Sequence, residues 1–134
     1  MIESGLFQLI TANAAFAALA ETRLYPLALP ESLIVPSGTP ASATYQVIST
    51  VPDYTNDGKS GLEKTRIRYT GIASTYESAA ATAEAVRGVL ENFNGSLADG
   101  TVVSNILVVN KSSSYSSESR LFFMAYDLMV FYAN

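Results

Sequence analysis

The chain has 134 residues, which is the length of one domain, so residues 1–134 are expected to fold as a single unit. Hydrophobic residues make up 49% and charged residues 15%, which excludes a disordered chain. The net charge is −4 and the 8 basic residues are scattered, so specific nucleic-acid binding is not expected. There is no Cys and no His, which excludes disulfides, thiolate metal sites and the most common general base.

The low proportion of charge leaves two interpretations open. Small monomers normally keep more charge on their surface. This chain, which also carries 8 Tyr and 6 Phe, either hides part of its surface against other copies or partners, or is a well-packed monomer. No basic region followed by a long apolar run is present, and no apolar run approaches the ~20 residues that span a bilayer. We therefore expect synthesis in the cytoplasm without a signal peptide.

The first third of the chain predicts a helix followed by extended segments. Residues 2–21 have apolar residues at helical spacing, and Asn13 either bends one helix or caps the second of two short ones. The proline-containing segment 23–29 predicts an edge strand or an irregular crossing. A loop is expected at 31–40, and a strand rich in β-branched residues at 42–50.

Residues 51–63 form a polar segment with two glycines and a proline. A hairpin turn needs two to five residues. A connection of this length therefore predicts a loop that is mobile or functional. We expect its polar and aromatic side chains to contact a partner; the candidates are Tyr54, Asn56, Asp57, Lys59 and Glu63.

The rest of the fold is organised around a strand at 65–73 and a helix at 75–93. Polar and apolar residues alternate along the strand, and an apolar stripe with a period of three to four then begins. Ser74 and Glu77 have the spacing of a capping box, and Gly95 stands where a helix commonly ends. The stripe is rich in Ala in its first turns, so we expect this helix to lie close against a sheet that contains the preceding strand.

The last third predicts two strands. Residues 101–110 form the first, and the Ser-rich segment 111–119 is expected to be a flexible loop whose Lys111, Tyr115 and Glu118 contact partners. Residues 120–132 form a strand that is apolar on both faces, which predicts burial on both faces. One face can meet the long helix, and the other needs cover from the N-terminal helix or from another subunit.

These elements predict an α+β fold with the order α-β-β-β-α-β-β. We expect a mostly antiparallel sheet, with the helix at 75–93 on one face and the N-terminal helix at the edge or on the other face.

No pattern of residues indicates catalysis or a metal site, so we expect no enzyme, no cofactor and no metal. Asp53 and Asp57 are interpreted as residues of a solvated turn, because the spacing of a calcium-binding loop is not matched. Residues 58–60 read GKS, but position 53 is Asp where a phosphate-binding loop has Gly. Asp127, the single charge in the final strand, is expected to face solvent or to pair with Arg66, Arg68 or Arg120.

Several segments in order resemble the small tail completion, or tail terminator, proteins of long-tailed bacteriophages. They are the sequence RLYP at 23–26, the strand entered from 40–47, the segment RIRYTGIASTYESA at 66–79, and the aromatic final strand. The similarity runs over most of the chain and is strongest between 66 and 90.

The resemblance implies a structural virion protein without catalytic activity. Such a subunit forms a ring, typically a hexamer, at the head-proximal end of the tail tube, where it ends tube growth and joins the tail to the head connector. Its partners would be other copies of itself, the tail tube protein and the head–tail connector or head-closure protein. DNA would pass the lumen without specific binding.

Two other functions stay open from the sequence. A small dimeric α+β module could bind a ligand in a pocket under the long helix, lined by Tyr45, Tyr69 and Tyr76, although each tyrosine also suits a packed core. An enzyme that uses carboxylates alone is the third possibility.

Overall fold

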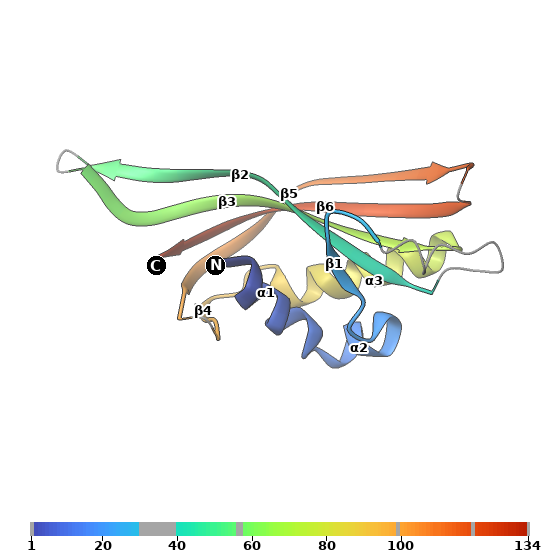
Figure 1. Ribbon diagram of the computed structural model, residues 1–134. Coiled ribbons are helices and arrows are strands. Elements are labelled where there is room, and N and C mark those ends of the chain that lie inside the picture. The colour runs from blue at the N-terminus through green and yellow to red at the C-terminus, as the bar shows by residue number, and fades with distance from the viewer. Residues whose placement is uncertain (1, 30–39, 56–57, 99, 119, 134) are drawn as a thin grey trace.

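The computed structural model describes residues 2–29, 40–55, 58–98, 100–118 and 120–133, and for residues 51–62 it describes the backbone alone. Within these residues the strands form one six-stranded sheet in the order β1-β2-β3-β6-β5-β4. Their bounds are β1 Leu24–Pro26, β2 Ser42–Thr55, β3 Gly58–Ala73, β4 Gly95–Ser96, β5 Val102–Ser116 and β6 Leu121–Ala133. The helices α1 (Ile2–Thr11), α2 (Ala14–Ala20) and α3 (Tyr76–Leu90) all lie on one face of this sheet (Figure 1).

The sheet is mixed, so the predicted antiparallel character is only partly correct. β1 pairs with β2 in parallel, whereas the other neighbouring strands are antiparallel. The predicted order also lacks β4, a strand of two residues, and the N-terminal helix is split in two. The mixed α and β character agrees with the prediction, and so does the packing of the long helix against a sheet that contains the strand at 65–73.

The N-terminal segment forms two helices separated by a sharp bend. The Asn13 side chain accepts hydrogen bonds from the backbone N–H groups of Ala15 and Phe16, at 3.0 and 3.1 Å. These bonds satisfy two donors that the first turn of α2 leaves without a helical partner, so Asn13 is the N-cap that the sequence suggested. Among the described helices, none alone has the length and hydropathy to cross a membrane; α1 and α2 meet that test only when counted together, across a bend of 82°.

Two segments expected to be loops are instead the ends of long hairpins. In the first, β2 and β3 stay paired, with two shifts of register, until Thr55 lies opposite Gly58. In the second, β5 and β6 stay paired until Ser116 lies opposite Leu121. Polar residues are accepted here because the preference of a residue for a strand depends on its surroundings, and pairing of the backbone with the neighbouring strand continues along both hairpins. The loop expected at 31–40 falls almost entirely outside the described residues.

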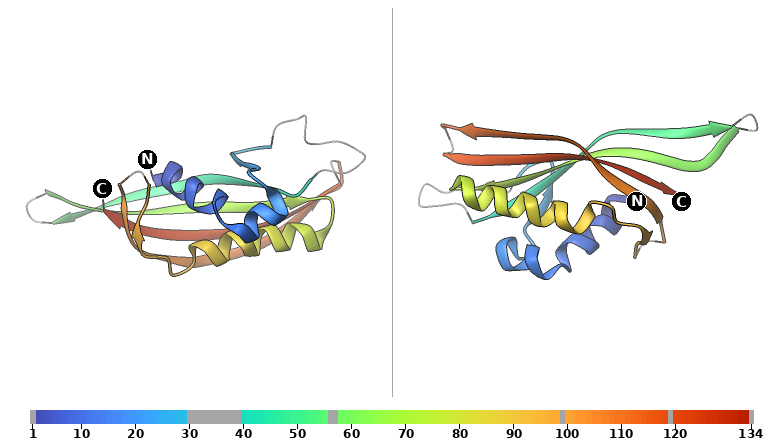
Figure 2. Two further views of the ribbon diagram at one scale, coloured as in Figure 1. Left: turned by 90° about the horizontal axis from the view of Figure 1, so that it is seen from below. Right: turned by 180° about the vertical axis from the view of Figure 1, so that it is seen from behind.

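The two hairpins point toward opposite ends of the molecule (Figures 1 and 2). The β2–β3 hairpin extends beyond the helices, while the β5–β6 hairpin lies above the first turns of α3. The molecule is therefore elongated along its sheet, and each end carries a different hairpin.

α3 begins and ends at residues other than those predicted. Its N-cap is Thr75, whose hydroxyl accepts a hydrogen bond from the N–H of Ser78 at 3.2 Å, so the capping box expected at Ser74 is wrong. The helix ends at Leu90, and Asn92 rather than a glycine takes the left-handed conformation after it, with φ of 62°. Asn tolerates this conformation better than most residues. Gly95, expected at the helix end, lies in β4.

The core forms where α3 rests directly on β3. A Cβ atom at Gly71 would lie 2.4 Å from the carbonyl oxygen of Ala79 and 2.8 Å from the nitrogen of Ala83. The helix backbone therefore touches the strand backbone, which explains the small residues on this side of α3. Beside α3, the helices α1 and α2 contribute Leu6, Ile10 and Phe16 to the core that also contains Ile67 of the sheet.

The N-terminal helices share the face that α3 covers, so the alternative that placed them on the other face is wrong. Phe16 and Leu6 are both fully buried there. Their apolar side chains pack against residues of α3 and β3 rather than across the sheet. The other face of the sheet is left without a helix among the described residues (Figure 2).

Replacing Gly71 with Ala should lower the free energy of unfolding by about 2–3 kcal/mol, because the new Cβ meets helix backbone that cannot rotate away. Gly88 is the matched control: it lies in α3, the helix that Gly71 contacts, and a Cβ atom at Gly88 would meet no atom within 4 Å. Gly88→Ala should raise the free energy of unfolding by about 1 kcal/mol through helix propensity. Urea unfolding of both variants measures the difference, and equal effects would contradict the close approach of α3 to β3.

Candidate functional site

The contact residues predicted from the polar segment 51–63 lie along the β2–β3 hairpin. Tyr54 and Lys59 are opposite each other in the backbone register near its tip, and Asn56 and Asp57 lie outside the described residues. Glu63 is nearer the body of the protein, where its carboxylate accepts a hydrogen bond from the hydroxyl of Tyr132 at 2.9 Å. Glu63 therefore has a structural contact within the chain.

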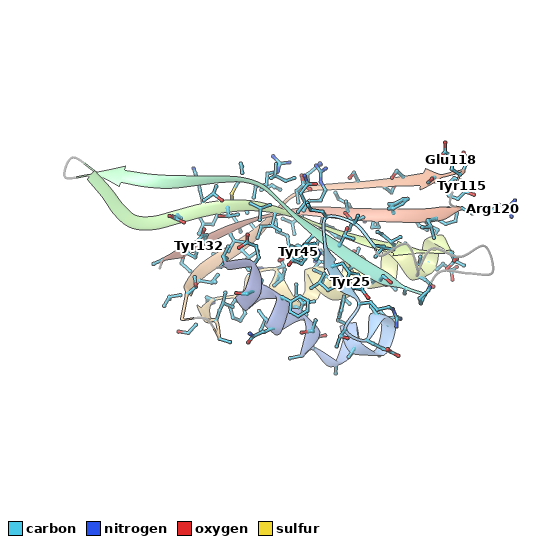
Figure 3. The ribbon with its side chains drawn as sticks, in the orientation of Figure 1. Tyr25, Tyr45, Tyr115, Glu118, Arg120 and Tyr132 are labelled. Atoms are coloured by element: carbon cyan, nitrogen blue, oxygen red, sulfur yellow. The ribbon has the colours of Figure 1, made fainter. Side chains whose placement is uncertain are left out.

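Of the contact residues predicted from the Ser-rich segment, Tyr115 and Glu118 lie at the opposite end of the sheet (Figure 3), whereas Lys111 pairs with Tyr126 near the middle of β6. The Tyr115 ring is half exposed and its centroid lies 4.6 Å from that of Phe122. The Lys111 ammonium lies 5.5 Å from the centroid of the Tyr126 ring, and Glu118 is exposed in the turn before β6. The structure thus does not unite the predicted contact residues in one site; it spreads them along the sheet, from the β2–β3 hairpin to the turn before β6.

The face of the sheet opposite the helices carries a surface that sequence reasoning noticed only in part. We call it the open face. The register defines it, because Arg66, Arg68 and Asp127 point away from the side on which Ile67 and Leu128 are buried under helices. Its other members include Ile48, Lys64, Val102, Leu107, Val109, Met129 and Phe131.

A cluster of three charges lies at the middle of the open face. Asp127 Oδ1 lies 2.7 Å from Nε of Arg68, and Oδ2 lies 2.6 Å from Nη2 of Arg66. The hydrogen bond from Arg68 is the main cause that lowers the pKa of the Asp127 carboxyl; burial opposes it, and Arg66 lowers the pKa further. The predicted pairing of Asp127 with Arg66 or Arg68 is therefore confirmed with both.

The strands β2 and β5, which flank the central pair β3 and β6, each contain a β-bulge near this cluster. Ile48 is the extra residue between the pairs Val47–Ile67 and Ser49–Arg66, and Val109 is the extra residue between the pairs Val108–Leu128 and Asn110–Asp127. A bulge bends its strand and increases the local twist. Both bulges therefore increase the bend and twist of the sheet next to the pairs that involve Arg66 and Asp127.

Apolar side chains surround the charges of the open face. Half of the eight large apolar side chains that the described residues leave exposed lie here, and these four are exposed by 39–50%: Ile48, Val102, Leu107 and Val109. Met129 and Phe131 are partly buried between them. Three basic residues and one carboxylate give the face a net charge of +2, in a chain whose net charge is −4. An apolar surface with arginines near its centre is typical of a protein–protein interface.

The three tyrosines proposed for a ligand pocket do not converge. Tyr69 is buried, and this burial raises the pKa of its hydroxyl; its ring centroid lies 6.2 Å from that of Tyr45. Tyr76 is exposed at the start of α3 and contacts Phe122 instead. The three tyrosines therefore do not line one pocket under α3.

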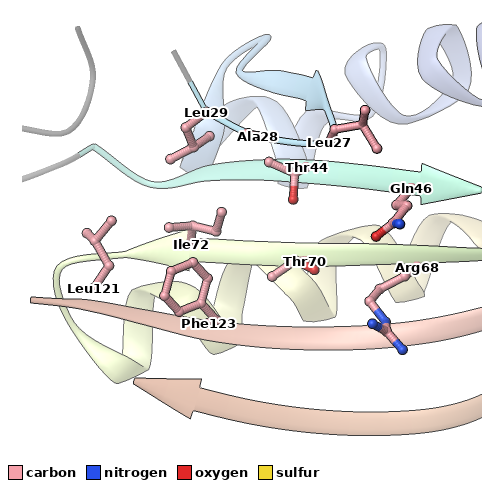
Figure 4. A pocket seen from close by; sticks show the side chains of 10 residues that line it. All are labelled: Leu27, Ala28, Leu29, Thr44, Gln46, Arg68, Thr70, Ile72, Leu121 and Phe123. Carbon is pink, nitrogen blue, oxygen red and sulfur yellow. The ribbon is translucent and has the colours of Figure 1, made fainter. Parts of the chain in front are cut away.

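A hollow of about 400 Å³ lies on the side of the open face, next to the residues that follow β1 (Figure 4). Its lining mixes apolar and polar groups: Leu27, Ala28, Leu29, Thr44, Gln46, Arg68, Thr70, Ile72, Leu121 and Phe123. Among the described residues there is no group of three or more His, Cys, Asp or Glu side chains that could hold a metal ion.

Comparison with known proteins gives a similarity in structure and none in sequence. No protein-family model and no curated protein matches the chain. Among solved structures, the chain is similar to a subunit of the virion of a native gene transfer agent particle, with a TM-score of 0.73 and 18% sequence identity. The match covers 99% of this chain and 95% of that subunit, so the two share their fold over nearly their whole length.

Replacing Asp127 with Asn should destabilise the fold at neutral pH. Removing one partner of a buried ion pair costs about 3–5 kcal/mol, and the partial exposure of both guanidinium groups lowers this to about 2 kcal/mol. Because the pKa of Asp127 is lower in the folded state, its contribution is complete above the unfolded pKa, about 3.9, and is lost as the pH falls through the folded value.

Urea unfolding of both proteins between pH 7 and pH 2 measures this contribution. The difference between the wild type and Asp127→Asn should narrow below about pH 4. Glu118→Gln, which removes an exposed carboxylate from a turn, is the control and should change stability by less than about 0.5 kcal/mol. A difference for Asp127→Asn that stays constant over the whole range would contradict the charge pairing.

Proposed function

We propose that this chain is a structural virion protein that forms a ring at the head-proximal end of a phage tail tube. There it ends the growth of the tube and joins the tail to the head connector. The observation that carries the proposal is the fold shared with a virion subunit over 99% of the chain and 95% of that subunit. A match of this extent concerns the whole domain rather than one common motif.

The sequence segments that resemble tail completion proteins support the more specific part of the proposal. The strongest, residues 66–79, covers the end of β3 and the start of α3, where Gly71 lets the helix lie against the strand. This unit is the structural centre of the fold. The segment at 23–26 coincides with β1, and that at 40–47 enters β2, its parallel partner.

A ring requires that each copy offer two different surfaces to its neighbours. The open face supplies one such surface, since it combines exposed apolar side chains with a positive charge. We expect a cyclic assembly, typically a hexamer, located in the virion tail after assembly in the host cytoplasm. An acidic subunit suits a lumen along which DNA slides without being held, because like charges do not attract the phosphate backbone.

The two hairpins at opposite ends of the sheet suit two different neighbours along the tail axis. In this proposal one end contacts the tail tube protein and the other the head–tail connector or head-closure protein. Tyr54, Asn56, Asp57, Lys59 and Glu63 are the proposed contacts along one hairpin, and Lys111, Tyr115 and Glu118 those along the other. Mobile or exposed polar segments commonly become ordered when a partner binds.

The proposal is tested by the oligomeric state of the purified full chain. Light scattering should give a particle of several subunits, and electron microscopy should show closed rings, either for the protein alone or after addition of tail tube protein. Tubes assembled in the presence of the chain should be shorter than tubes assembled without it. A monomer at every concentration, alone and with tube protein, would contradict the proposal.

A further inference from the structure

We propose that the open face of one copy binds the α2 side of the helix layer of the next copy. The ring in which this contact would occur rests on the proposed function, but the contact itself is argued from two complementary surfaces. One surface is the open face defined above. The other is formed by the outer side of α2 and by Glu21, which directly follows it.

α2 has an unusual composition for a helix at the surface. Its seven residues, AAFAALA, contain no polar side chain. Phe16 and Ala20 are buried in the core, while Ala14, Ala15, Ala17, Ala18 and Leu19 are exposed. The outer side of α2 is therefore flat and apolar, and the larger apolar side chains of the open face can pack on it.

The two sides of the sheet carry net charges of opposite sign. The helix layer, taken as residues 2–29 and 74–94, has five acidic and two basic side chains, which gives a net charge of −3. Glu21 directly follows α2, and its side chain is 77% exposed although it also pairs with Arg23. On the open face, three basic residues and Asp127 give a net charge of +2. Complementary charges favour this pairing and set its orientation.

The arginines of the open face can bind a second carboxylate. Arg66 and Arg68 hold Asp127 through their Nε and Nη2 atoms, yet their side chains stay 35% and 41% exposed. A guanidinium group has five N–H donors, and Asp127 takes two from each arginine. A carboxylate of a neighbouring copy can therefore approach without displacing Asp127.

The same charges disfavour the other ways of pairing two copies. Two open faces against each other would oppose +2 to +2, and two helix layers would oppose −3 to −3, and such like-charge contacts are unfavourable. Open face against helix layer is a heterologous contact, which repeats from copy to copy and closes as a ring when the rotation fits. Exposed Leu107 and Val109 also suit a protein surface better than a nucleic-acid backbone.

Engineered cysteines test the contact directly, since the native chain contains no Cys. Ala18→Cys places a thiol on the outer side of α2, and Leu107→Cys places one on the open face; both residues are exposed. With a short bifunctional maleimide, the double variant should form a ladder of covalent oligomers, whereas each single variant should stay monomeric on a denaturing gel. Leu107→Cys combined with Ser117→Cys, in the turn between β5 and β6, is the matched control and should give no ladder.

A charge exchange provides a second measurement. Lys64 is exposed on the open face, and Lys64→Glu should abolish assembly seen by light scattering. Adding Glu21→Lys to the same chain should restore it, because the pair of charges is then reversed. Circular dichroism of each variant confirms that the fold is intact.

Each contrary result has a defined meaning. Dimers formed by Leu107→Cys alone would show that two open faces meet, which overturns the inference. Rings that give no ladder and persist in Lys64→Glu would overturn it while leaving the proposed function standing. A wild-type monomer under all conditions would overturn both. Binding of a DNA duplex that Lys64→Glu abolishes, without any ladder, would make the open face a nucleic-acid surface and also overturn the inference.

Discussion

The interaction on which the structure depends is the carboxylate of Asp127 held between Arg66 and Arg68. It lies at the centre of the sheet, joins β3 to β6 and is 1% exposed. A buried charge without partners would be very unfavourable, so the apolar final strand can contain Asp127 only because two arginines face it. The bulges of β2 and β5 occur at the same level, and the sheet bends there. The ionic cluster thus joins the two central strands of the sheet, β3 and β6, near the bulges of the strands that flank them.

The molecule is asymmetric across its sheet because every described helix lies on one side of it. On that side, the backbone of α3 touches Gly71, and α1 and α2 complete the core. On the other side, apolar residues and arginines face outward without a described helix above them. In the proposed ring, this face would be one of the two different surfaces that each copy offers to its neighbours.

The sequence predicts helices and strands reliably where apolar residues recur at a regular spacing, and less reliably where a segment is polar throughout. The stripe of α3, the cap at Asn13 and the apolar strand β6 were readable because each depends on side chains near in sequence. The ends of both hairpins were not, since their polar residues stay in strand form through pairing with the neighbouring strand. The sequence also predicted that the second face of β6 would be covered, by the N-terminal helix or by another subunit. That the N-terminal helices leave this face bare depends on tertiary packing, which no local pattern contains.

The most direct test of this account is a reconstruction of the purified assembly by electron cryo-microscopy. The account predicts a closed ring in which the Arg66–Asp127–Arg68 cluster of every copy is buried against α2 of the next copy, with acidic side chains beside the arginines. A particle whose open faces all contact solvent, or meet each other in pairs, would contradict it.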